Sequence, residues 1–183
     1  MKKALLLPIM LCILLVLSAC GGNAEDEFGS FCAELEQAQS IGFTAKLRAD
    51  YEDKTANFKL AYTQNAEEIT VTVIEPETIS GISARVKDDS ARLEYDGVIL
   101  DIGSLDANGL CPMSALPVTV MALRNAHVDS VWEEDGMTAA RLIVSDDTSV
   151  TVWLDGEMTP CSAEISSGGK AVVFIEFYDW EMK

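Results

Sequence analysis

The sequence has little of what most enzymes use for chemistry. Among its 183 residues there is one histidine, His127. A serine-type hydrolase needs a base beside a nucleophile and an orienting acid, and no G-x-S-x-G or comparable signature is present. The 30 acidic residues contain no identifiable pair of glycosidase carboxylates. We therefore expect a protein that is not an enzyme and that carries no cofactor.

Metal-binding patterns are missing as well. Cys32, Cys111 and Cys161 lack the paired C-x-x-C spacing of a zinc site, and no calcium-loop spacing relates the aspartates. Several aspartates instead fall at predicted hairpin turns, where this residue is common, namely Asp88, Asp89, Asp146, Asp147 and Asp155. We expect no metal site. The three cysteines are interpreted as buried thiols or, alternatively, as one disulfide involving Cys111 with a leftover thiol.

Basic residues are scarce, with 13 lysines and arginines against 30 acidic side chains and a formal net charge of −17. A surface of this sign is repelled by nucleic acid and by anionic lipid headgroups. We expect no nucleic-acid partner, and any attachment to a membrane must depend on something other than electrostatic attraction.

The N-terminus has the pattern of a secretory signal. Met1-Lys2-Lys3 precedes an apolar run over 4–17, which is too short for a confident membrane span, and Leu17-Ser18-Ala19-Cys20 follows. This segment resembles the bacterial lipoprotein signal with its lipobox. An uncleaved membrane anchor with an incidental cysteine is the alternative interpretation.

The lipobox resemblance implies cleavage before Cys20 and acylation of that cysteine with diacylglycerol and an N-linked chain such as palmitate. Removal of 1–19 takes away two of the 13 basic residues and no acidic one, which leaves a formal balance of −19. Two or three acyl chains anchor a protein far better than one. We predict a signal peptide over 1–19, an acylated tether over 20–27, and an extracytoplasmic protein that is lipid-anchored to a bacterial cell membrane.

The remaining 28–183 predict one domain of the α+β class. Phe28, Phe31 and Leu35 share one face at helical spacing, so a helix is expected to run from there to about Ser40. Beyond Gly42, alternation of apolar and polar residues predicts about ten strands joined by short turns, including the turn at Asp96-Gly97. An open antiparallel sheet of that size tends to curl, so we expect it to be strongly curved.

The segment "CPMSALPVTVMALRNAH" predicts the one interior helix, from about Leu116 to Ala126, because Pro117 suits a first helical turn. It is too short to cross a membrane. Its apolar residues lie nearly all round, so we expect it to contact protein, or protein and ligand, on more than one side.

The phrase "ITVTVIEPETISGISARV...ARLEYDGVIL", a strand closed by a proline and then a hairpin around Asp-Gly, carries a resemblance. Together with the order of elements, it makes 28–183 resemble the lipoprotein-carrier (LolA/LolB-like) superfamily. That family implies an unclosed half-barrel around a hydrophobic cavity, with the N-terminal and central helices covering the concave side, and binding of lipids or of the acyl chains of lipoproteins. A weaker likeness is to clostridial germination lipoproteins of the same fold, which bind an enzyme partner.

The leading hypothesis is therefore a binding module that holds an apolar ligand, either a lipid or an acyl chain of another protein, between the sheet and the central helix. Its alternative is a non-catalytic regulatory subunit of an envelope enzyme, with the same fold and a filled core. The predicted cavity-lining residues, whose aromatic members would otherwise be ordinary core, are Leu116, Val120, Met121, Leu123, Trp132, Phe174 and Tyr178.

Overall fold

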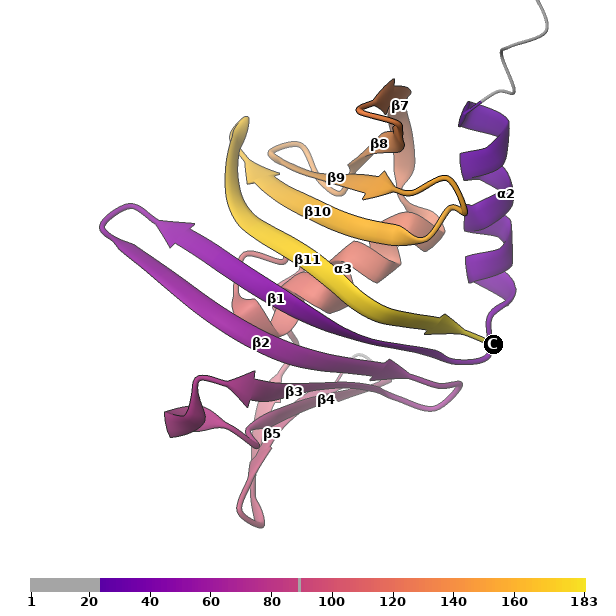
Figure 1. The fold of residues 1–183 in the computed structure, drawn as a ribbon. Helices are drawn as coiled ribbons and strands as arrows, with labels where there is room; N and C mark the ends of the chain where they lie inside the picture. Colours follow the sequence, from indigo (N-terminus) through magenta and orange to yellow (C-terminus); the bar gives the residue numbers. More distant parts are fainter. Residues whose placement is uncertain (1–23, 89) are drawn as a thin grey trace, which may run out of the picture.

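One antiparallel sheet organises the molecule (Figure 1). The computed structural model describes residues 24–88 and 90–183, so the predicted signal peptide and Cys20 lie outside the described residues. Within them, eleven strands follow the order β6-β5-β4-β3-β2-β1-β11-β10-β9-β8-β7. The predicted curved, unclosed sheet with two helices is confirmed, with eleven strands in place of about ten.

The first half of the sheet is a meander of successive hairpins. The strands β1 and β3 alternate buried and more exposed side chains, as the period of two in the sequence predicts, and β3 ends immediately before Pro76. Asp96 and Gly97 both have positive φ, 48° and 78°, which is the geometry of a two-residue type I′ turn. The strands are β1 (Ile41–Tyr51), β2 (Lys54–Gln64), β3 (Ile69–Glu75), β4 (Ser83–Lys87), β5 (Ser90–Tyr95) and β6 (Val98–Gly103).

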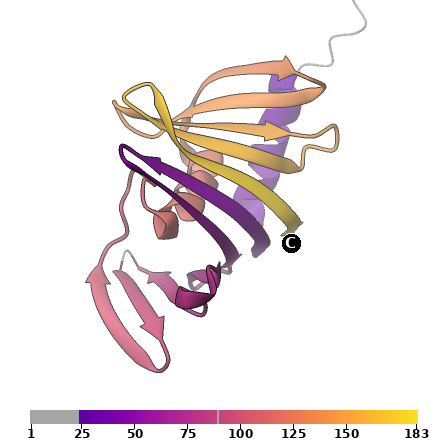
Figure 2. The same cartoon turned by 60° about the vertical axis from the view of Figure 1, so that its left-hand side comes forward.

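The second meander pairs with the first through its last strand. β11 lies antiparallel to β1, so the two halves form one continuous sheet whose free edges are β6 and β7. Figure 2 shows the β5–β6 hairpin projecting from the body of the sheet. The strands of this half are β7 (His127–Glu134), β8 (Met137–Ile143), β9 (Thr148–Leu154), β10 (Pro160–Ser167) and β11 (Lys170–Met182).

The N-terminal helix, α2 (Ala24–Gln37), begins four residues before the predicted start at Phe28 and ends three before Ser40. Phe28, Phe31 and Leu35 are buried, as their spacing predicts. The start was predicted too late because Glu25, Asp26 and Glu27 were assigned to a tether, whereas acidic side chains stabilise the first turn of a helix.

The central helix, α3 (Pro112–Asn125), also begins earlier than predicted. Pro112, and not Pro117, occupies the first turn, where a missing N–H costs nothing. Pro117 lies inside the helix and cannot donate to the Met113 carbonyl. Either proline is compatible with the first turn of a helix, so the sequence alone did not determine which of them begins α3. The packing of the rest of the fold places Pro112 there.

The core lies between the sheet and the two helices. The inner face of the sheet, defined as the face toward α3, contributes buried residues of seven strands to this core, namely β1, β2, β3, β8, β9, β10 and β11. The helix α3 contributes most of its apolar side chains. Among the fully buried side chains on this face are Leu47, Leu60, Leu142, Ile165 and Ile175, each no more than 2% exposed. Side chains therefore fill the space between the sheet and α3.

Gly109 sets how closely the chain before α3 can approach that helix. Its φ is +70°, and a Cβ at this position would lie 2.9 Å from the Val118 Cβ and 3.0 Å from the Ile165 Cδ1. A side chain here would therefore push α3 away from the sheet, in addition to straining the backbone.

We predict that Gly109→Ala lowers the free energy of unfolding by about 1–3 kcal/mol, measured by chemical denaturation. The matched control is Gly136→Ala, since Gly136 also has positive φ but has no atom within 4 Å of its Cβ position. An equal loss in both variants would show that backbone strain alone, without the contact to Val118, explains the effect.

Candidate functional site

Two large hollows lie on opposite sides of the sheet. The first, here called the lateral pocket, has a volume of about 560 Å³ and lies beside α3. The second, here called the outer groove, has a volume of about 690 Å³ and crosses the outer face of the sheet, away from α3. Both volumes are within the roughly 300–1,000 Å³ of small-molecule sites, so their chemistry must decide which suits an apolar ligand.

The lateral pocket exists because the sheet is not closed. One side of α3 packs on the inner face, and the other side is met only by the ends of flanking strands and by the loop over 104–107. Met121, which is 56% exposed, lies at this second side. The other apolar lining residues are Pro117, Val118 and Ala122 of α3, Ala126, Ile69 of β3, Val86 of β4, Leu105 and Ala107 of the loop, and Ile143 and Val144.

A few polar groups accompany this apolar lining. Asp106, Asn125 and His127 lie at the lateral pocket, and the Asp106 carboxylate accepts hydrogen bonds from the backbone N–H groups of Asn108 and Leu110. These bonds hold the loop in place beside α3. An apolar cavity with a small number of polar groups is the usual composition of a ligand pocket.

Three of the predicted cavity-lining residues are ordinary core. Leu116, Val120 and Leu123 are no more than 2% exposed, and they pack against the inner face instead of lining a pocket. These three side chains fill the space between the sheet and this side of α3. Of the predicted helix residues, Met121 is the one at the lateral pocket.

The other three predicted residues lie on the outer face. Trp132 and Tyr178 are on this face by strand register, and Phe174 lines the outer groove. The Arg48 guanidinium lies 4.1 Å from the centre of the Phe174 ring, and the Lys46 ammonium lies 5.2 Å from that of Tyr178. Cations that stack on aromatic rings in this way gain roughly 0.5–1 kcal/mol each at exposed sites.

Simple alternation along β11 predicts that Trp180 lies on the same side as Phe174 and Tyr178. A bulge explains why it lies on the opposite side. The register of β11 against β1 shifts between the partners of Gly42 and Thr44, and Asp179 has φ 53°. Trp180 consequently turns to the inner face, where its ring stacks on Phe43 with centroids 4.6 Å apart. An extra residue in a strand reverses the side on which later residues lie.

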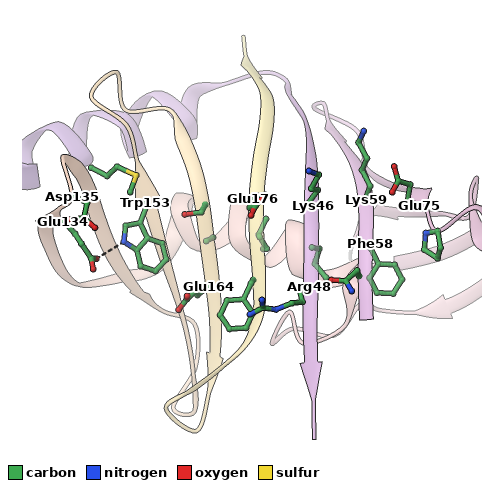
Figure 3. Close-up of a pocket in the computed structure, with 18 residues that line it drawn as sticks. Lys46, Arg48, Phe58, Lys59, Glu75, Glu134, Asp135, Trp153, Glu164 and Glu176 are labelled. Atoms are coloured by element: carbon green, nitrogen blue, oxygen red, sulfur yellow. Dashed lines mark hydrogen bonds between the residues drawn. The ribbon is translucent and has the colours of Figure 1, made fainter. Parts of the chain in front are cut away.

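The outer groove carries charged side chains of both signs among its aromatic and apolar ones (Figure 3). Lys46 and Lys59 are direct cross-strand partners, with Glu176 beyond the first and Glu75 beyond the second. This row of partners continues through Ser162 to Trp153. Charged groups and an open face suit a hydrated ligand, so the outer groove is a poor site for an acyl chain.

Glu134 joins two tryptophans at one end of the outer groove, as Figure 3 shows for Trp153. Its Oε2 accepts hydrogen bonds from the indole N–H groups of Trp153, at 2.9 Å, and of Trp132, at 3.2 Å. These donors favour the charged form of the carboxyl and lower the pKa of Glu134 below its ordinary value of 4.5.

Comparison with known proteins rests on structure. No protein-family model and no curated protein matches the sequence. An outer membrane lipoprotein-sorting protein domain from Vibrio parahaemolyticus is similar with TM-score 0.50 and 12% identity, over 88% of this chain and 94% of that one. An uncharacterized conserved protein from Thermus thermophilus has TM-score 0.51 and 8% identity, over 88% of each chain.

The chain has a LolA-like fold. A LolA superfamily protein from Nitrosomonas europaea covers 85% of the chain, with 93% of its own length, at 11% identity and TM-score 0.45. The lipoprotein-sorting domain from Vibrio parahaemolyticus confirms the resemblance inferred from the sequence at the level of the fold. At these identities the likeness establishes the fold and leaves the ligand of this LolA-like chain to be argued from its own residues.

Sequence reasoning missed most of the lateral pocket. On α3, a signal was available, because Pro117, Val118, Met121 and Ala122 share the side opposite Leu116, Val120 and Leu123. The contributions of Ile69, Val86 and Ile143 had no such signal, since each reads as an ordinary strand residue. Their convergence depends on how far the edges of the LolA-like sheet curl around α3.

The cysteines and metal-binding groups give no sign of chemistry in the described residues. Cys32, Cys111 and Cys161 are free and partly buried, so the alternative of a disulfide is not realised. Burial raises the pKa of the Cys32 thiol to about 11, which keeps it protonated and unreactive near neutral pH. Residues 24–88 and 90–183 contain no cluster of metal-ligating side chains and no helix long and apolar enough to cross a membrane.

We predict that the indole N–H resonances of Trp132 and Trp153 shift together in NMR spectra as Glu134 protonates, with a midpoint below pH 4.5. The lowered pKa means that the carboxylate keeps both hydrogen bonds until the pH falls through that value. Trp180 serves as the internal control, and Glu134→Gln should abolish the titration. A midpoint at or above 4.5 would contradict the shared hydrogen bonding.

Proposed function

We propose that this chain is an extracytoplasmic lipoprotein that is anchored through Cys20 and binds a lipid or acyl chain in the lateral pocket. The observation that carries the proposal is the second apolar side of α3, where the exposed Met121 and the largely buried Val118 line a pocket of about 560 Å³. Extracytoplasmic location is supported by the signal pattern over 1–20 and by the LolA-like fold.

The chemistry of the pocket supports an apolar ligand. Burial of apolar surface contributes roughly 25 cal/mol per Å², and the lining side chains of the pocket supply such surface from α3, β3, β4 and β8. Asp106, Asn125 and His127 could contact a polar headgroup, because they lie at the same pocket. The outer groove, although larger, offers charged groups whose burial beneath an acyl chain would be unfavourable.

The anchor follows from the sequence and from chain length. Cys20 is four residues before Ala24, the first residue of α2, so an acylated cysteine would lie at most about 15 Å from that helix. The domain would therefore be held close to the bilayer at the N-terminal end of α2. With a formal net charge of −19 after removal of 1–19, the anchored protein gains no electrostatic attraction to anionic lipid, so the acyl chains must supply the attachment.

We predict that lipid co-purifies with the full-length chain and that the protein binds a fluorescent fatty acid. Met121→Glu should weaken this binding at least about tenfold, because a carboxylate at the pocket opposes an apolar ligand by about 1.4 kcal/mol or more. Met121 is exposed, so the substitution should leave the fold intact.

The matched control for this measurement is Val128→Glu, since Val128 is also exposed and apolar but does not line the pocket. Lipid extraction followed by mass spectrometry, together with fluorescence titration, provides the readouts. Absence of both extracted lipid and fatty-acid binding would refute the ligand proposal. Equal weakening by both substitutions would place the binding elsewhere on the molecule.

We predict that Cys20→Ser prevents acylation and releases the chain from its normal membrane attachment. Intact-mass measurement of the wild-type protein should show a mass above that of 20–183 by the added acyl groups. Cys32→Ser is the control, because Cys32 lies within α2 and should leave attachment unchanged. If Cys20→Ser fractionates and migrates as the wild type does, the anchor proposal fails independently of the ligand proposal.

A further inference from the structure

The β5–β6 hairpin carries most of the exposed apolar side chains of the described residues. Five of the nine large hydrophobic side chains that are exposed there belong to this hairpin: Tyr95, Val98, Ile99, Leu100 and Ile102. Val98, Ile99 and Leu100 are 69%, 62% and 59% exposed. No residue of β6 is buried. This concentration differs from the scattered exposed hydrophobic residues of an ordinary protein surface.

The two free edges of the sheet differ in their protection. β7 carries Asp129, Glu133 and Glu134, and such charges discourage pairing with another strand. β6 carries one acidic residue, Asp101, and no lysine, arginine or proline. Asp101 is already engaged locally, because it lies opposite Arg92 and its Oδ1 accepts the Gly103 N–H. Apart from a register shift between Asp101 and Gly103 at its far end, the β6 edge therefore lacks the charged residues and prolines that oppose strand addition.

The turn determines which backbone groups of β6 are free. In a two-residue hairpin, Tyr95 and Val98 form the hydrogen-bonded pair next to the turn, and such pairs alternate with non-hydrogen-bonded ones along the ladder. Val98 and Leu100 consequently direct their N–H and C=O groups toward β5. Those of Ile99 and Asp101 point outward, where a further strand could bond to them.

We propose that β6 pairs antiparallel with β6 of a second copy of this chain, with Leu100 opposite Leu100 at the twofold axis. In this register the outward N–H and C=O groups of Ile99 bond to those of Asp101 in the second copy, and those of Asp101 bond to those of Ile99 in the second copy. Val98 then lies opposite Ile102 of the second copy, so apolar residues face apolar residues across the axis. Shifting the axis to Ile99 would place Ile102 opposite the turn residue Asp96, and shifting it to Asp101 would oppose two acids.

The shape of the molecule permits this pairing. In Figures 1 and 2 the hairpin projects at one end of the molecule, and the N-terminal end of α2 lies at the other. Two acidic bodies joined at their hairpins would remain apart, which limits repulsion between copies that each carry a formal charge of −19 after removal of 1–19. Because salt screens that repulsion, the dimer should strengthen as the ionic strength rises. Formation of this dimer requires neither the lateral pocket nor a ligand bound in it.

Disulfide cross-linking tests the register in the membranes of cells that express the full-length chain. A non-hydrogen-bonded antiparallel pair places its Cα atoms about 4.5 Å apart, which is within the range of about 4.4–6.8 Å that a disulfide spans. Leu100→Cys should therefore give a covalent dimer under mild oxidation. Val128→Cys, on the other edge strand, and the wild type, with its three partly buried cysteines, are the controls.

A mass measurement on the purified full-length protein completes the test. Sedimentation of the wild type should give twice the chain mass, and Leu100→Lys should give the monomer with an unchanged circular dichroism spectrum, because Leu100 is exposed. The proposal requires both results. It is overturned if Leu100→Cys yields no dimer beyond Val128→Cys, if its adduct contains a different protein, or if the wild type and Leu100→Lys sediment alike.

Discussion

The pairing of β1 with β11 is the interaction on which the rest of the structure depends. It joins the two meanders, runs through the register from Ile41 to Ala49, and continues at the chain end, where Gln39 and Ser40 donate to the Lys183 carbonyl. Phe43 reinforces it from the inner face by stacking on Tyr62 of one half and on Trp180 of the other. Because this seam makes one sheet of two, it also determines that β6 and β7 are the free edges.

An open sheet explains the two-sided apolar character of α3. The connection from β6 to β7 must cross from one edge to the other, and α3 makes that crossing over the inner face. Leu116, Val120 and Leu123 pack on the sheet, while Met121 is exposed on the opposite side, where it lines the lateral pocket together with the largely buried Val118. The lateral pocket is thus a consequence of topology, since a closed sheet would have covered both sides of the helix.

The distribution of charge separates the surfaces of the molecule. Lysine and arginine are few, yet Lys46, Arg48 and Lys59 lie together on two adjacent strands of the outer face. Lys46 and Arg48 lie over aromatic rings, and Lys59 is the cross-strand partner of Lys46. Acidic residues occupy the β7 edge, and the β6 edge has almost no charge. The apolar surfaces that remain, the lateral pocket and the β5–β6 hairpin, are therefore the regions in which a ligand or a second chain meets least electrostatic opposition.

Local signals in the sequence determined the elements and the fold class. Alternation predicted the strands, Pro76 and Asp96-Gly97 their ends and turns, and the spacing of Phe28, Phe31 and Leu35 the buried side of the first helix. Choices between equivalent local signals required tertiary contacts, as with Pro112 and Pro117 at the start of α3. Tertiary structure also determined on which face of the sheet each residue of β11 lies. A bulge at Asp179 turns Trp180 to the inner face and leaves Phe174 and Tyr178 on the outer face. The lateral pocket was decided by tertiary structure alone, since its walls come from strands, a loop and a helix that are brought together only by the curl of the open sheet around α3.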